Sequence, residues 1–175
     1  AYLRERVEAA GVFVLLIGNL GSHHSTLNIE LFRGFALADP VAPFIVINDQ
    51  DSEAAWCFTL LHELAHVWLG QTGVSGAAPG TPIEIFCNDV AGRILLPTPE
   101  IAQEQDLKGA PQARIVARIG ELAAARNVSH SMVAYKLYRE GIISREIWSA
   151  VTSLFRQRWV ANRDLARDAR NSDGG

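Results

Sequence analysis

The sequence predicts an α+β fold, in which a small antiparallel sheet of about three strands packs on a pair of helices and a helical C-terminal part follows. The short apolar runs that are typical of strands all lie before Asp49, and the rest of the chain has helical spacing. Strands followed by helices, without alternation, favour α+β over a parallel sheet. The 175 residues, 49% hydrophobic and 20% charged, are enough for a domain with a hydrophobic core.

The strands are predicted from three apolar runs. VFVLLI, residues 12–17, is typical of a buried strand, and the Gly, Ser and Asn content of residues 18–30 predicts a loop. LFRGFAL (31–37) and PFIVIN (43–48) predict two more strands, separated by the turn sequence ADPVAP. We therefore expect the second and third strands to form an antiparallel hairpin.

A long helix is predicted from about residue 52 to residue 69. Asp51 or Ser52 can cap its free N–H groups, because both side chains accept hydrogen bonds from the first turn. Gly70 is typical of the residue that follows the last turn of a helix. The next residues, QTGVSGAAPGTP, are rich in Gly and Pro and predict a loop.

A second helix is predicted over residues 82–96, since Pro82 suits a first helical turn and Pro97 follows the end. Ser129 and Ser144 are expected to cap later helices. The remaining helices are predicted over residues 99–106, 111–126, 129–140 and 144–168.

We expect a core over residues 1–110, a helical subdomain over 111–170 that packs on it, and a disordered tail over 171–175. The charge divides at the same place: residues 1–110 hold 5 Lys and Arg against 13 Asp and Glu, and residues 111–170 hold 11 against 5. Such asymmetry occurs in proteins that bind nucleic acid, but also where two lobes attract each other or helix faces are solvated. The start, AYLRERVEAAG, lies within a predicted helix and lacks Met, so we expect a piece of a longer protein.

The composition favours a cytoplasmic protein with no membrane partner. No apolar run approaches the roughly 18 residues that suggest a membrane span, and the start has no secretory signal pattern. Cys57 and Cys87 form no CxxC motif and are expected to be reduced thiols.

The segment FTLLHELAHVWLG, residues 58–70, is apolar except for His62, Glu63 and His66, and such groups are costly to bury without partners. Residues four apart share a helix face, so His62 and His66 present two imidazoles to one point. Glu63 lies about 100° around the helix, beside a metal held by the histidines. HExxH also occurs by chance in unrelated helices, but this spacing is the one that two zinc ligands and a general base require.

A catalytic zinc needs a third protein ligand and one open position. Glu84, on the second helix, is the predicted third ligand. Asn88 lies one turn further on the same face and can accept a hydrogen bond from a ligand imidazole. Cys87 is a weaker rival, because a thiolate would reduce the Lewis acidity of the metal. This carboxylate, with a polar group at i+4 on the helix after HExxH, is the arrangement of gluzincin peptidases.

Three blocks in this order resemble the ImmA/IrrE family of zinc-dependent metallopeptidases: FRGFALADPVAPFIVIN, FTLLHELAHVWLG and EIFCNDVAGRILLP. The resemblance covers most of residues 11–100 and is weaker beyond them. The family pattern of the second helix is roughly E-x-E-A-N-x-F-A-A-x-L-L-P. Glu84 occupies its first acid and Asn88 its Asn, whereas Phe86 replaces the second acid, Cys87 an Ala and Val90 a Phe.

The resemblance implies a zincin-like fold and a cytoplasmic, zinc-dependent endopeptidase with His62, His66 and Glu84 as Zn²⁺ ligands and Glu63 as the catalytic base. It also implies a protein substrate, typically a helix-turn-helix transcriptional repressor cleaved as a step in transcription regulation. An N-terminal helix-turn-helix domain precedes the peptidase in many members of the family, and would fit a chain that starts within a helix.

Two features of the substrate site are left open by the sequence. A second oxyanion donor could be any of four side chains, and the adjacent histidines are expected more often at a surface than in a catalytic role. The candidates are His23, His24, His130 and Tyr135. FIVIN, in the third strand, is expected to be a sheet edge that holds an extended substrate by backbone pairing.

Two alternative functions are open. The segment IGELAAARNVSHSMVAYKLYREGII resembles a helix-turn-helix, and the basic balance of residues 111–170 fits a DNA-binding regulator. Only Lys136 and Arg139 are cationic in its second helix, so we expect DNA binding through this region less than proteolysis. The other alternative is a catalytically silent homologue that binds a partner, against which the intact HELAH motif argues.

Overall fold

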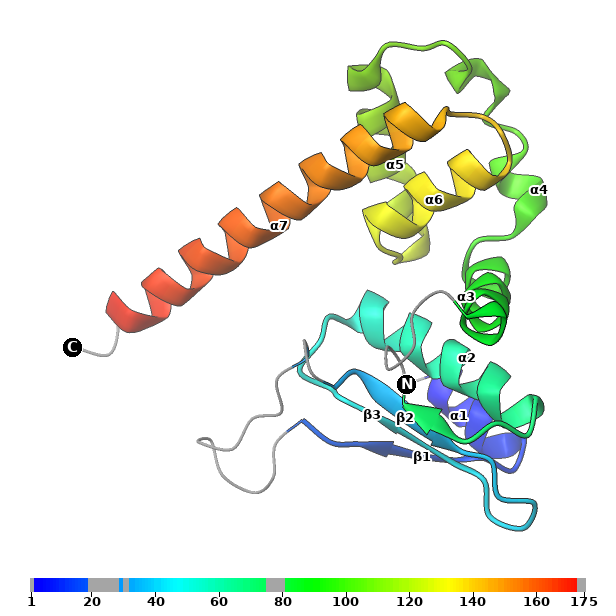
Figure 1. The fold of residues 1–175 in the computed structure, drawn as a ribbon. Helices are drawn as coiled ribbons and strands as arrows, with labels where there is room; N and C mark the ends of the chain where they lie inside the picture. The colour runs from blue at the N-terminus through cyan, green and yellow to red at the C-terminus, as the bar shows by residue number, and fades with distance from the viewer. Residues whose placement is uncertain (1, 19–28, 30–31, 75–80, 173–175) are drawn as a thin grey trace. The chain divides into compact units, whose positions relative to one another are not determined.

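The computed structural model describes residues 2–18, 29, 32–74 and 81–172 (Figure 1). The chain divides into two compact units, Ala1–Pro97 and Thr98–Gly175, each held together by contacts among its own residues. The class is α+β, as predicted, because a single sheet lies in the first unit and the second unit is helical.

The sheet of the first unit contains β1 (Phe13–Leu16), β2 (Gly34–Leu37), β3 (Phe44–Ile47) and β4 (Gly73–Val74), in the order β1-β3-β2-β4. The predicted hairpin is confirmed, since β2 and β3 are antiparallel. β1 runs parallel to β3, so the sheet is mixed and not wholly antiparallel as expected. The chain between β1 and β3, residues 17–43, includes β2, which runs antiparallel to β3 and so returns the chain to the end at which a strand parallel to β1 begins. The sequence pattern of β1 does not encode its direction.

β3 is an inner strand, so the expectation that FIVIN forms a sheet edge is wrong. The strand pairs with β1 on one side and with β2 on the other, which uses its backbone groups in both directions. The apolar side chains of FIVI describe the two faces of the strand and not its edges, so the sequence does not distinguish an inner strand from an edge strand.

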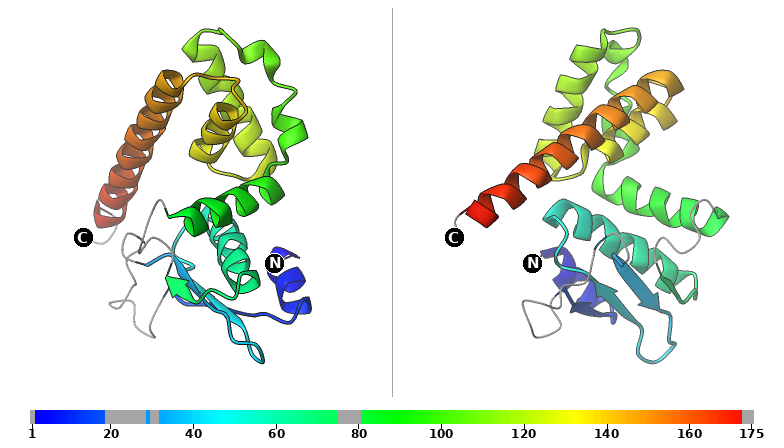
Figure 2. Two further views of the ribbon diagram at one scale, coloured as in Figure 1. Left: turned by 45° about the vertical axis from the view of Figure 1, so that its right-hand side comes forward. Right: turned by 60° about the vertical axis from the view of Figure 1, so that its left-hand side comes forward.

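The described residues of the first unit also form α1 (Tyr2–Ala9), α2 (Glu53–Trp68) and α3 (Pro82–Leu95). α2 packs on β2 and β3, and α3 packs on α2, which Figure 2 shows from two sides. Both ends of α2 follow the prediction: Oγ of Ser52 accepts from the N–H of Ala55 at 3.3 Å, and Gly70 has a φ of +66°. The core between the sheet and the helices consists of Val7, Val12, Val14, Ala36, Ile45, Ile47, Leu60, Leu61, Leu64 and Ala91.

The second unit contains α4 (Thr98–Ile101), a 3-10 turn (Gln105–Leu107), α5 (Gln112–Arg126), α6 (His130–Arg139) and α7 (Arg145–Ser172). The helix predicted over 99–106 is thus broken: α4 ends at Ile101, and the 3-10 turn follows at Gln105. Ile101 and Leu107 are both buried and would lie about 120° apart on one continuous helix. α7 continues past the predicted end at residue 168. Beyond that residue, Ala169 and Arg170 favour helix.

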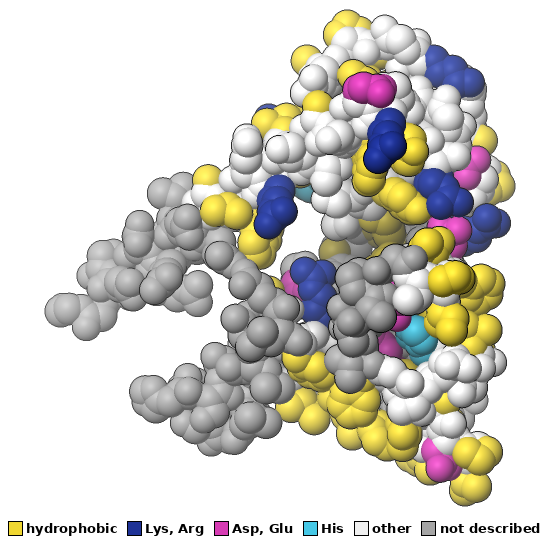
Figure 3. All heavy atoms as spheres, in the orientation of Figure 1, with side chains coloured by type: hydrophobic (Ala, Val, Ile, Leu, Met, Phe, Trp, Pro, Cys, Tyr) yellow, Lys and Arg dark blue, Asp and Glu magenta, His cyan; other side chains and the backbone are white. Residues whose placement is uncertain are grey.

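Residues 98–107 belong to the helical unit, although the sequence analysis assigned them to the core. Three arginines of α5 pair with three acids of this segment: Arg126 with Glu100, Arg118 with Glu104, and Arg114 with Asp106. Figure 3 shows basic and acidic side chains next to one another on this unit. With the buried Ile101 and Leu107, these pairs attach the segment to α5.

Within residues 2–18, 32–74 and 81–172, no helix combines the length and apolar content that crossing a bilayer requires.

Candidate metal centre

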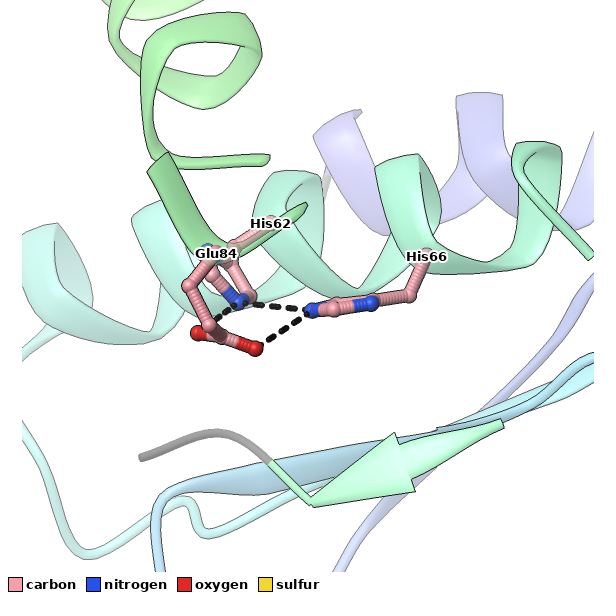
Figure 4. Close-up of side chains that lie close together, drawn as sticks. All are labelled: His62, His66 and Glu84. Atoms are coloured by element: carbon pink, nitrogen blue, oxygen red, sulfur yellow. Dashed lines mark hydrogen bonds and ion pairs between the residues drawn. The ribbon is translucent and has the colours of Figure 1, made fainter. Parts of the chain in front are cut away.

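α2 presents His62 and His66 on one face, one helical turn apart. Both are almost fully buried, at 4% and 5% exposure. Their Nε2 atoms lie 3.1 Å apart, so the two imidazoles converge on one point as the i, i+4 spacing predicts (Figure 4). The convergence brings together two basic nitrogen atoms in a place that is largely shielded from solvent.

Glu84 completes the cluster from the first turn of α3. Its Oε2 lies 3.3 Å from Nε2 of His62, and its Oε1 lies 3.1 Å from Nε2 of His66. The N-terminus of α3 is set by Thr81, whose side chain accepts from the backbone N–H of Glu84 at 3.4 Å. Thr81 is not among the helix caps predicted from the sequence, although TPIE matches the capping pattern Ser/Thr-x-x-Glu.

The donor atoms of this cluster fit a divalent cation. Zinc binds imidazole nitrogen and carboxylate oxygen at about 2.0–2.1 Å, and two ligands of a tetrahedral site then lie about 3.3 Å apart. The distances of 3.1 to 3.3 Å between the His62, His66 and Glu84 atoms agree with that spacing. Within the described residues, these three form the group of side chains that could hold a metal ion.

Asn88 fixes the tautomer of His62. Oδ1 of Asn88 lies 3.0 Å from Nδ1 of His62, and because an amide oxygen can only accept, Nδ1 carries the proton. Burial lowers the pKa of His62, which keeps the ring neutral. Nε2 of His62 therefore directs a lone pair at the carboxylate of Glu84 and at Nε2 of His66. The lone pairs of these three groups repel one another, and a cation placed among them would remove that repulsion.

Glu63 follows His62 and is completely buried. Burial, and after it the negative charge of Glu84, raise the pKa of Glu63 to about 8. A divalent cation held by the neighbouring ligands would favour the ionised carboxylate and lower this pKa. The structure thus provides a carboxyl group that can take up and release a proton near neutral pH.

Cys87 is buried on α3 but is not part of the cluster of possible ligands formed by the described residues. Burial raises the pKa of its thiol to about 11, with smaller contributions from the charges of Glu84 and Glu63. The geometry of the described residues thus supports Glu84, and not Cys87, as the third candidate ligand.

The structure describes two of the four candidates for a second oxyanion donor, His130 and Tyr135. His23 and His24 lie outside the described residues. His130 and Tyr135 belong to α6 and have partners within their own unit. The ring of His130 stacks on Phe155 at 4.7 Å, and the hydroxyl of Tyr135 accepts from Nη1 of Arg139 at 2.9 Å.

Comparison with known families places most of the chain in one family model. The model of the Peptidase M78 family, described as the IrrE N-terminal-like domain, matches residues 19–138. Comparison with curated proteins and with solved structures found no match. The matched region includes the three candidate metal ligands, His62, His66 and Glu84, and also Glu63.

Removing the amide of Asn88 should weaken metal binding. We expect Asn88→Ala to lower the affinity for Zn²⁺ about tenfold, because Nδ1 of His62 loses its acceptor and the ring its fixed orientation. Competition with a chromophoric chelator measures the affinity. Asn88→Asp, which keeps an acceptor, should stay close to the parent, and equal affinities of Asn88→Ala and the parent would contradict the assigned hydrogen bond.

The buried carboxyl of Glu63 should make the metal-free protein less stable as the pH rises. The unfolded chain releases this proton near pH 4.5 and the folded chain near pH 8, so the stability it contributes is lost between these values. His62, with its lowered pKa, has the opposite effect, but only below its unfolded value of 6.5.

Between pH 6.5 and 8, the parent should therefore lose about 2 kcal/mol relative to Glu63→Gln. Urea unfolding in EDTA measures the difference. Glu53→Gln, at an exposed position of the same helix, serves as the control and should follow the parent. Parallel curves for the parent and Glu63→Gln would show that Glu63 is not held in its protonated form.

Proposed function

Because the chain belongs to the Peptidase M78 family with the IrrE N-terminal-like domain, we propose that it is a zinc-dependent endopeptidase that hydrolyses a peptide bond in a protein partner. The observation that carries the proposal is the convergence of Nε2 of His62, Nε2 of His66 and the carboxylate of Glu84 within 3.3 Å of one another. Two imidazoles and one carboxylate are the ligand set of catalytic zinc in peptidases.

The proposed roles follow from the positions of the side chains. His62, His66 and Glu84 would hold Zn²⁺, which would supply Lewis acidity and lower the pKa of a water at the site toward neutrality. Glu63 accepts a proton from the attacking water and passes it to the amine that leaves. Asn88 keeps the ring of His62 in the tautomer that exposes the Nε2 lone pair.

The proposed substrate is a helix-turn-helix transcriptional repressor, cleaved as a regulatory step in the cytoplasm. The resemblance of the three sequence blocks to the ImmA/IrrE family supports this substrate class. A cytoplasmic location agrees with the two cysteines, Cys57 and Cys87, both of which are free thiols.

The contacts of the second unit weaken the case for DNA binding through residues 111–170. Arg114, Arg118 and Arg126 contribute to the basic balance of residues 111–170, yet each is paired with an acid. In α6, Lys136 is buried and Arg139 donates to the hydroxyl of Tyr135. Cations engaged in this way add little to the positive potential that phosphate binding requires.

A Glu63→Gln variant should bind zinc and cleave nothing, because glutamine has nearly the same shape but cannot accept the proton of water. The assay incubates zinc-loaded protein with a proteome-derived peptide library and identifies products by mass spectrometry. The parent is expected to generate new termini and Glu63→Gln none at equal zinc content. Equal cleavage by both would refute the role of Glu63, and no cleavage by the parent would favour a catalytically silent homologue.

The Glu84→Ala variant should lose zinc affinity by about two orders of magnitude or more, because one of three protein ligands is removed. Competition with a chelator gives the affinity, and emission spectroscopy gives the bound metal. Ile85→Ala, which changes an exposed side chain of the same helix, is the matched control. An unchanged metal content in Glu84→Ala would exclude this residue as a ligand.

A further inference from the structure

Gly34 on β2 faces the turn of α2 that carries Glu63. A Cβ added to Gly34 would lie 2.7 Å from Cγ2 of Thr59 and 2.9 Å from the carbonyl oxygen of Val46. The same Cβ would lie 3.4 Å from Oε1 of Glu63. Real Cβ atoms essentially never approach other heavy atoms within 3.0 Å, so this position has no room for a side chain.

The two closest neighbours of Gly34 are fixed. Thr59 is buried, and its Oγ1 donates to the carbonyl of Ala55 at 3.1 Å, which sets the direction of its methyl group. Val46 lies on β3, which is held between β1 and β2. A methyl group on Gly34 would therefore have to separate α2 from β2.

Packing excludes a side chain at Gly34, whereas backbone conformation favours glycine at the described positions with positive φ. Gly11, Gly70, Gly109 and Gly141 have positive φ, where the backbone conformation favours glycine. Gly34 does not have positive φ, so it is the approach of α2 that excludes a side chain. Among the described glycines without positive φ, Gly73 and Gly120 have nothing within 4 Å of an added Cβ. Gly18 is also crowded, but by side-chain atoms of Asp49 and Gln50, whereas one of the close atoms at Gly34 is a backbone carbonyl oxygen.

The face of α2 that approaches Gly34 differs from the face that binds the metal. Thr59 and Glu63 lie one turn apart and approach β2, whereas Nε2 atoms of His62 and His66 converge with a carboxylate from α3. The ligand cluster is thus assembled between α2 and α3. The position of the Glu63 carboxylate depends in addition on the gap between α2 and β2.

We propose that Gly34 is a positioning residue for Glu63: by lacking a side chain, it lets β2 lie close enough to α2 to hold the Glu63 carboxylate in one place beside the metal ligands. The inference rests on the proposed role of Glu63 as the catalytic base. A wider gap would leave the zinc ligands together but would displace or loosen this carboxylate. Displacements of about 1 Å can lower a rate about 100-fold.

The test compares Gly34→Ala with the parent. We expect kcat to fall about 100-fold on a peptide that the parent cleaves in the library, while KM and zinc affinity change by no more than about twofold. Gly120→Ala, where an added Cβ meets nothing, is the control and should keep the parent kcat. An unchanged kcat in Gly34→Ala, or a loss of zinc affinity in proportion to kcat, would overturn the proposal.

A second substitution tests whether crowding is the cause. Thr59→Ser removes Cγ2 but keeps the hydroxyl that donates to Ala55. Added to Gly34→Ala, it should restore kcat about tenfold, whereas Thr59→Ser alone should match the parent. If Gly34→Ala does not fold, the double variant is compared with Thr59→Ser instead. Failure of Thr59→Ser to restore kcat would overturn the crowding argument.

Crystal structures of the metal-free parent and of Gly34→Ala provide a readout that does not depend on activity. The carboxylate of Glu63 should move by more than about 0.5 Å relative to His62, His66 and Glu84 in the variant. An unmoved carboxylate would refute the inference. If the parent cleaves no peptide, the proposed function fails, and the two structures still decide whether Gly34 positions Glu63.

Discussion

The first unit depends on the burial of polar side chains in an apolar helix. His62, Glu63 and His66 are together less than a tenth exposed, and each lies where water cannot easily satisfy it. The Nε2 lone pair of His62 is directed at a second imidazole and a carboxylate, an arrangement that only a proton or a cation makes favourable. The requirement for a partner therefore links the stability of α2 to the ligand that it would bind.

The surrounding elements satisfy this requirement in different ways. α3 supplies Glu84 as the third donor and Asn88 as the acceptor that orients His62. Because Gly34 has no side chain, the backbone of β2 packs closely against Thr59 and Glu63. α2 thus presents ligands to a helix on one face and a carboxyl group to the sheet on another. The two faces can be altered separately by mutation.

In the second unit, the charge composition of the sequence does not show which basic side chains are paired with acids. Residues 111–170 are strongly basic in sequence, which suggests a surface for phosphates. The structure pairs three arginines of α5 with Glu100, Glu104 and Asp106, acids that the sequence analysis had counted with the other half of the chain. The opposite charges of the two segments thus form ion pairs within a single unit.

The sequence by itself determined the elements whose cause is local: the caps and ends of α2, the shared face of His62 and His66, and the choice of Glu84 and Asn88 on a helix with the right period. Helical spacing and capping depend on residues within one or two turns, so a short segment contains the whole signal. Only the tertiary structure decided the parallel direction of β1, the inner position of β3, the break after Ile101 and the contact of Gly34 with α2. Each of these depends on which distant segment lies alongside, and local spacing carries no information about that.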